Sequence, residues 1–131
     1  MERTITIPSS LEQINLIEKI IDEITEKLSV TPDVYGKILI ASIEGVNNAI
    51  VHGNKFDKTK VVSININVGK NRIIVTIADQ GNGFDPYNVP DPTTPENREN
   101  ISGRGVFLMK KLSDDITFEN NGSTVKMIFY L

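Results

Sequence analysis

Two polar residues at helical spacing, Glu44 and Asn48, are the first candidates for chemistry in this sequence. Residues four positions apart lie one turn above each other on a helix, so this carboxylate and carboxamide share one face. Ile43, Val46 and Ile50 recur at helical spacing on another face, which suits a hydrophobic core. The pair could act in acid–base chemistry and metal binding, although such pairs are also common on solvated surfaces.

An acidic residue followed by two glycines is the second candidate. Asp79, Gly81 and Gly83 come directly after the apolar run 73–78, which favours a buried strand. Glycine lets a backbone approach a ligand closely or adopt a positive φ. The same residue types are typical of a simple β-turn, so this pattern alone leaves both interpretations open.

A third candidate, Gly103-Arg104-Gly105, leads into an apolar-patterned helix that runs through Leu112. Backbone N–H groups at a helix start favour an anion such as phosphate, but a plain loop-to-helix junction has the same sequence pattern. Arg104 suits either a phosphate contact or solvent. The preceding connection, residues 84–102, holds four of the six prolines and lacks periodicity, which predicts a functional lid or a disordered segment.

Two helices are expected in the first half of the chain. Apolar residues at steps of three and four predict the first helix, with a capping box at Ser9 or Ser10. Its apolar stripe is suited to the core or to a partner interface. Thr31 is the predicted N-cap of the second helix, which carries Glu44 and ends near Gly53, where glycine suits a C-terminal cap.

The remaining segments predict strands. Their apolar residues alternate with polar ones, and Gly or Asn turns separate the strands of two hairpins. The expected strands are residues 3–7, 62–68, 73–78, 115–119 and 124–130. With the helices between them, they predict an α+β fold, a two-layer α/β sandwich with a mixed, mostly antiparallel sheet.

The composition indicates a single domain, residues 1–131, with one core. The chain has 14 basic and 17 acidic residues and a net charge of −3, which argues against a broad basic surface for nucleic acid. Without cysteine, and with His52 as its one histidine, it cannot build a cysteine or multi-histidine metal centre. No apolar run reaches the ~20 residues that span a membrane, and no signal-peptide pattern is present, so a cytoplasmic location is expected.

The order of these motifs resembles the GHKL (Bergerat) ATP-binding superfamily over nearly the whole chain. The motifs that carry the resemblance are an N box at Glu44–Asn48, an Asp-x-Gly-x-Gly box at Asp79–Gly83, a second glycine box at Gly103–Gly105 and a closing Gly-Ser-Thr at Gly122–Thr124. The length, the short lid and the run Glu-x-x-x-Asn-Ala-Ile-x-His-Gly are most similar to the small stand-alone anti-sigma-factor serine kinases.

The resemblance implies roles for the nucleotide-binding residues. Asp79 would accept a hydrogen bond from the adenine amino group, and Thr124 would support that contact through water. The Gly81 and Gly83 positions would allow close approach of the nucleotide. Gly103 and Gly105, with Arg104 as a possible contact, would bind phosphate at the helix end.

The resemblance also implies the catalytic chemistry. Asn48 would hold Mg²⁺ through its oxygen, which is sufficient because Mg²⁺ keeps several waters and phosphate oxygens as ligands. Glu44 would take a proton from, or orient, a serine hydroxyl, or activate water as an ATPase base. His52 suits a helix-end or lid contact better than catalysis. Some relatives have an arginine where this chain has Ile101; either Arg98 or Arg104 would replace it, or kinase activity would be weak.

The expected function is that of an ATP- and Mg²⁺-dependent serine/threonine protein kinase acting by partner switching. It would phosphorylate a STAS-domain anti-sigma-factor antagonist and also bind a competing partner, such as a sigma factor. A homodimer is a family expectation. The alternatives are a nucleotide-dependent protein-binding regulator with little kinase activity, which Ile101 favours, and an ATPase or a detached histidine-kinase catalytic domain.

Overall fold

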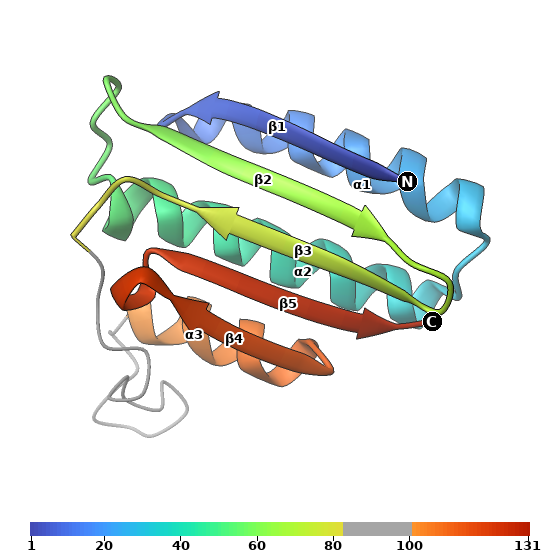
Figure 1. Ribbon diagram of the computed structural model, residues 1–131. Helices are drawn as coiled ribbons and strands as arrows, with labels where there is room; N and C mark the ends of the chain where they lie inside the picture. Colours follow the sequence, from blue (N-terminus) through green and yellow to red (C-terminus); the bar gives the residue numbers. More distant parts are fainter. Residues whose placement is uncertain (83–100) are drawn as a thin grey trace.

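The protein was analysed as a computed structural model, which describes residues 1–82 and 101–131, without the side chains of residues 101 and 102. Figure 1 shows a sheet in one layer and helices in the other. The elements are β1 (Glu2–Pro8), η1 (Leu11–Gln13), α1 (Ile14–Leu28), α2 (Pro32–Asn48), η2 (Ala49–Gly53), β2 (Val61–Val68), β3 (Arg72–Ala78), α3 (Ile101–Leu112), β4 (Asp115–Glu119), η4 (Asn120–Gly122) and β5 (Thr124–Tyr130).

The sheet contains five strands in the order β1-β2-β3-β5-β4. Each of the four strand pairs in the described residues is antiparallel, so the sheet is more regular than the mixed, mostly antiparallel arrangement expected from the sequence. β3 and β5 pair although residues 79–123, which include α3 and β4, separate them in sequence (Figure 1). This pairing brings the end of β3 beside the start of β5.

Buried and partly exposed residues alternate along the strands, and the buried residues form one apolar face of the sheet. On β2, Val62, Ile64 and Ile66 are buried, and the residues between them are partly exposed. The same alternation holds for β3 and β5, and the helices cover this buried face (Figure 1). The predicted two-layer sandwich is therefore confirmed.

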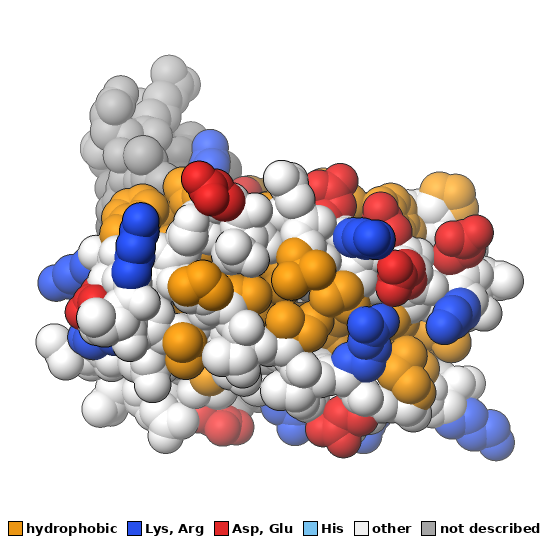
Figure 2. All heavy atoms as spheres, turned by 90° about the horizontal axis from the view of Figure 1, so that it is seen from above, with side chains coloured by type: hydrophobic (Ala, Val, Ile, Leu, Met, Phe, Trp, Pro, Cys, Tyr) orange, Lys and Arg blue, Asp and Glu red, His pale blue; other side chains and the backbone are white. Residues whose placement is uncertain are grey.

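α1 packs mainly through its apolar stripe. Ile17, Ile21 and Ile24 are buried, whereas Leu11 and Leu28 at the two ends of the stripe remain exposed. Figure 2 looks onto the side of the molecule that is at the top of Figure 1, where β1 and α1 lie. Hydrophobic side chains gather near the middle of this side, and charged side chains surround them. The stripe belongs largely to the core.

The predicted capping box is wrong, because neither serine caps a helix. The segment begins as the short 3₁₀ turn η1, and the Ser10 side chain makes no cap hydrogen bond. The Ser9 hydroxyl instead donates to the carbonyl oxygen of Lys60 at 2.8 Å and is buried. Ser9 Oγ also accepts a hydrogen bond from Asn54 Nδ2 at 2.9 Å, so both of its hydrogen bonds join the segment before β2 and not the start of the helix.

α2 begins as predicted, since the Thr31 hydroxyl accepts a hydrogen bond from the Val34 amide and Pro32 occupies the first turn. At its other end α2 continues into the π-helical turn η2, where the Asn54 amide donates to the Ala49 carbonyl. Gly53 is not a left-handed C-cap, because the positive φ angles follow it, at Lys55 and Phe56. Its role lies in the packing described below.

None of the helices in the described part of the chain is long and apolar enough to cross a membrane.

Candidate functional site

A small pocket lies between the C-terminal half of α2, the ends of β3 and β5, and α3. It is narrow in this structure, with about 10 Å³ of enclosed space, which is room for one water molecule. It is lined by Gly45, Asn48, Ala49, Ile77, Asp79, Met109, Phe118, Gly122, Ser123 and Val125. Three of the four sequence motifs therefore contribute to one cavity, whose lining mixes apolar side chains with the polar Asn48, Asp79 and Ser123.

Gly45 allows the helices and the sheet to come close at this pocket. A Cβ atom at this position would lie 2.5 Å from Ile77 Cδ1 and 3.3 Å from Met109 Sδ. The absence of a side chain thus lets α2 pack directly against β3 and α3. This packing places the next turn of α2, with Asn48, at the pocket wall.

Glu44 and Asn48 meet the second glycine box. A Cβ atom built on Gly105 would lie 3.5 Å from Glu44 Oε2 and 4.0 Å from Asn48 Oδ1. Gly105 is buried, and both polar side chains are partly exposed. The side-chain oxygens of Glu44 and Asn48 on α2 therefore lie beside the backbone of α3 at Gly105. The order of the motifs predicted that these residues would meet.

Asp79 is held by backbone hydrogen bonds at the end of β3. Its amide donates to the Ser123 carbonyl at 2.9 Å, and its Oδ1 accepts from the Gly81 amide at 2.8 Å. Burial raises the pKa of the Asp79 carboxyl, while the Gly81 hydrogen bond and the charge of Lys60 oppose that rise. A half-buried carboxylate with one oxygen not engaged by Gly81 suits recognition of a hydrogen-bond donor.

Gly53 and Gly81 cross closely behind Asp79. A Cβ atom on Gly81 would overlap the Gly53 carbonyl group, 2.6 Å from its carbon. A Cβ atom on Gly53 would overlap the Asp79 carboxylate, 2.8 Å from Oδ1. Both glycines are therefore required by close packing, and neither has a positive φ. This contact joins the end of η2 to the Asp79 turn.

Thr124 lies at the start of β5, directly after Ser123. It pairs with Ala78, and its hydroxyl accepts a hydrogen bond from Asn120 Nδ2 at 3.1 Å. Successive residues of a strand point to opposite faces, so Thr124 and Val125 cannot both face the helices. Val125 and Ser123 line the pocket, whereas Thr124 is not among its lining residues. Ser123 is therefore the hydroxyl residue that lines the pocket, and the water-mediated support of adenine by Thr124 stays a prediction.

The second glycine box lies inside α3 rather than before it. α3 begins at Ile101, so Gly103 and Gly105 occupy its first two turns. Both glycines are buried, and Arg104 between them is exposed. The N-terminal end of α3 thus remains close to Glu44 and Asn48, as a phosphate-binding role requires.

His52 lies in η2, beside Gly53, and lines a separate polar pocket with Lys60 and Asn82. Burial lowers the pKa of His52, so its imidazole is neutral at neutral pH. This position at the helix end agrees with the expected non-catalytic role. Gly83 and Arg98 lie outside the described residues, as do the lid positions up to 100, and the Ile101 side chain is not described.

Comparisons with known proteins agree with this geometry. Residues 7–129 match the histidine kinase-like ATPase domain family. Serine-protein kinase RsbW of Bacillus subtilis (strain 168) is 32% identical over 135 residues, covering 95% of this chain and 82% of the relative. RsbW of Staphylococcus aureus (strain MRSA252) is 31% identical over 134 residues, covering 95% and 84%. The chain belongs to the histidine kinase-like ATPase family.

A solved structure shares the fold of this histidine kinase-like ATPase domain. It contains the RsbU and RsbW domains of Rv1364c from Mycobacterium tuberculosis and superposes with a TM-score of 0.66 at 18% identity. The match covers all of this chain and 32% of that longer chain. At this identity the likeness supports the fold alone, and the predicted Bergerat architecture is confirmed.

Sequence reasoning missed Asn54, which organises the support of this ATPase-type site. Asn54 is 2% exposed, and its Nδ2 donates to Ser9 Oγ at 2.9 Å and to the Val61 carbonyl at 3.0 Å. Its Oδ1 accepts from the Gln80 amide at 2.8 Å, and Gln80 Oε1 accepts from the Val61 amide at 2.7 Å. The only sequence signal for this role is an asparagine directly after the His-Gly pair.

Replacing Asn54 with alanine should lower the free energy of unfolding by about 3 kcal/mol, because buried donors and acceptors lose their partners. Ser9→Ala should lower it by about 1 kcal/mol, since it removes one partner of the same network. Urea denaturation of both variants measures the difference. Equal stability of wild type and the Asn54→Ala variant would contradict the supporting role of Asn54.

Proposed function

We propose that this chain is an ATP- and Mg²⁺-dependent serine/threonine protein kinase that phosphorylates a STAS-domain anti-sigma-factor antagonist. The observation that carries the proposal is one pocket with Asp79 at one end and Asn48 at its wall, with Glu44 one turn away. Membership in an ATPase-domain family and relatives named serine-protein kinases support nucleotide binding and a kinase type of activity.

The adenine end of the site would be formed by Asp79. Its carboxylate would accept a hydrogen bond from the exocyclic amino group of adenine, which guanine lacks at that position. The apolar side chains of Ile77 and Met109 line this narrow pocket and would contact the faces of a purine ring once the pocket widens. Ser123 contributes a further polar group at the same end, and Gly81 with Gly83 would complete the turn around the base.

The phosphate end would be formed by α2 and α3. Asn48 Oδ1 offers the hard oxygen ligand that Mg²⁺ prefers, and it lies beside Gly105 of α3. Gly103, Gly105 and Arg104 would bind the phosphates there. When bound, Mg²⁺ supplies neutralisation of the phosphate charge. No cluster of three acidic or histidine ligands exists among the described residues, so Asn48 would share the metal with phosphate and water.

Glu44 would act as the catalytic base. It would accept the proton of the attacking serine hydroxyl as that oxygen bonds to the γ-phosphorus and the bond to the ADP oxygen breaks. Its carboxylate lies beside Gly105, where the phosphates would be bound. A carboxylate at this position serves both proton transfer and orientation of the serine.

Glu44→Gln should reduce phosphate transfer to a STAS-domain protein by about 100- to 1,000-fold, in the range of general-base contributions. ATP affinity should change less than about threefold, because the carboxylate does not contact the base or hold the metal. Transfer of labelled γ-phosphate to serine, followed by phosphoamino-acid analysis, measures the rate. Calorimetry measures the affinity. Unchanged transfer would remove Glu44 from catalysis, and phosphohistidine would contradict the serine kinase proposal.

The runner-up function is a nucleotide-dependent protein-binding regulator with little kinase activity. The observation that favours it is Ile101, which stands where some relatives have an arginine. ATP-dependent partner binding without phosphate transfer by the wild-type chain would select this function. We further propose that the protein acts in the cytoplasm as a homodimer and binds a competing partner such as a sigma factor.

A further inference from the structure

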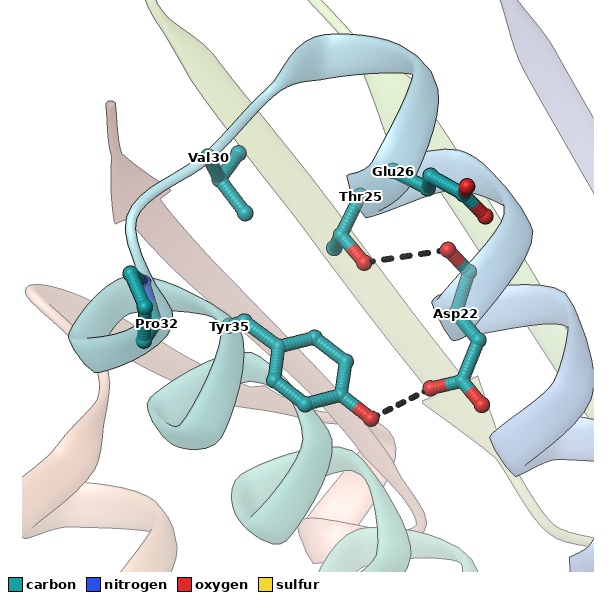
Figure 3. Close-up of a pocket in the computed structure, with 6 residues that line it drawn as sticks. All are labelled: Asp22, Thr25, Glu26, Val30, Pro32 and Tyr35. Carbon is teal, nitrogen blue, oxygen red and sulfur yellow. Dashed lines mark hydrogen bonds between the residues drawn. The ribbon is translucent and has the colours of Figure 1, made fainter.

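A groove lies between the last turns of α1 and the first turn of α2, far from the nucleotide site. It is lined by Asp22, Thr25, Glu26, Val30, Pro32 and Tyr35 (Figure 3). Most of its exposed lining is apolar, and the Thr25 hydroxyl is already used by the Ile21 carbonyl at 2.7 Å. Along α2, Tyr35 and Asn48 are separated by about 20 Å of helix axis. The groove is therefore distinct from the proposed ATP pocket.

A hydrogen bond between the two helices holds the groove in shape. The Tyr35 hydroxyl donates to Asp22 Oδ1, so the tyrosine ring from α2 faces α1 across the groove (Figure 3). The Thr25 hydroxyl donates to the Ile21 carbonyl and the Tyr35 hydroxyl donates to Asp22, so both hydroxyl groups have hydrogen-bond partners within the protein. The surface that a partner could still contact is apolar. It is formed by Val30, Pro32 and the Tyr35 ring, and we call it the apolar floor of the groove.

An acidic row borders this floor. Glu18, Asp22 and Glu26 are four residues apart, so they align along one side of α1. None of the three forms an ion pair within 4 Å in residues 1–82 and 101–131, where the ion pairs are Arg3–Glu23 and Lys37–Asp33. The pKa of Tyr35 is raised by its hydrogen bond to Asp22 and also by the charge of Glu18, so the field of the row reaches the groove.

We propose that this groove docks a lysine- or arginine-rich segment of a protein partner, with one apolar side chain inserted between α1 and α2. Charge complementarity selects the basic segment, because three uncompensated carboxylates stand beside an apolar floor. The apolar floor selects a protein segment over a small polycation, which would leave the floor uncovered. The proposal does not depend on kinase activity, since the groove and the nucleotide site lie at opposite ends of α2.

The probe for the test is a synthetic peptide with one leucine flanked on each side by three lysines. Two control peptides replace the leucine with serine or the lysines with glutamate. Titration into the ¹⁵N-labelled full chain at low salt should shift amide signals around Val30 and Tyr35, and affinity should fall as salt is added. Neither control peptide should produce these shifts at the same concentration.

A triple variant, Glu18→Gln with Asp22→Asn and Glu26→Gln, should bind the peptide about tenfold more weakly at low salt. The Asp22→Asn change keeps an acceptor for the Tyr35 hydroxyl, so the groove retains its shape. A matched triple variant, Glu12→Gln with Asp115→Asn and Glu119→Gln, removes the same charge from exposed positions away from the groove and should bind like wild type. ATP affinity, measured on both variants, should be unchanged.

Three results would overturn the proposal. Equal weakening by the two triple variants would show a general charge effect, and equal binding of the serine peptide would show that no apolar anchor is used. If sedimentation without peptide showed a homodimer for wild type and a monomer for the groove variant, the groove would instead bind a second copy of the chain. If the wild-type chain bound no ATP, the proposed kinase function would be contradicted, but the result for the groove would still stand.

Discussion

Asp79→Asn should weaken ATP binding about 100-fold, because a charge-assisted hydrogen bond to the adenine amino group becomes a weaker neutral one or is replaced by a donor–donor clash. Calorimetry with ATP, ADP and GTP measures this loss. The selectivity for ATP over GTP should disappear together with the affinity. An Asp33→Asn variant, which changes an exposed acid at the opposite end of α2, should bind ATP as wild type does.

The fold of the Asp79→Asn variant should survive, since an asparagine oxygen can still accept the Gly81 amide. Burial raises the pKa of Asp79 above its ordinary value of 3.8, so ionisation is less favourable in the folded state than in the unfolded state. This contribution makes wild type more stable as the pH falls through the raised pKa. The variant lacks that pH dependence and should be no less stable at neutral pH. Undiminished ATP selectivity in a folded variant would remove Asp79 from base recognition.

Gly81→Ala should lower the free energy of unfolding by about 3 kcal/mol, because the new methyl group overlaps the Gly53 carbonyl and the backbone must move apart. Since the same contact supports Asp79, ATP affinity should fall as well. Urea denaturation and calorimetry on the purified variant measure the two effects.

Gly36→Ala is the matched control for this substitution. No atom lies within 4 Å of a Cβ built on Gly36, which is inside α2. Alanine there should raise stability by about 0.5–1 kcal/mol, as expected for a helix interior. If Gly81→Ala were as harmless as Gly36→Ala, the close crossing of Gly53 and Gly81 would not be a requirement of the fold.

The fold could be predicted because its signals are local. The alternation of Val62, Ile64 and Ile66 marks a strand with one buried face, and Thr31 followed by Pro32 marks a helix start. Hairpin turns also follow from Gly and Asn at fixed places. Such patterns depend on neighbours in sequence, and the structure confirms each of these elements.

The site was predicted in part, because its support depends on contacts between distant segments. The meeting of Glu44, Asn48 and Gly105 followed from the order of the motifs. The Asn54 network joins residues up to 45 positions apart, and no periodicity reveals it. Which of Ser123 and Thr124 lines the pocket depends on the register of β3 and β5, and a one-residue shift would reverse it. Tertiary register is not readable from one strand alone.

The pairing of β3 with β5 also has a consequence for synthesis of the protein. Ser123 and Val125, which line the pocket, lie at the start of β5, and the Ser123 carbonyl holds the Asp79 amide. A chain emerging from the ribosome therefore presents α1, α2 and their groove long before it can complete the nucleotide pocket. ATP can stabilise the protein only after β5 has paired with β3. Early folding of the nascent chain must therefore depend on packing between α1, α2 and the strands β1, β2 and β3.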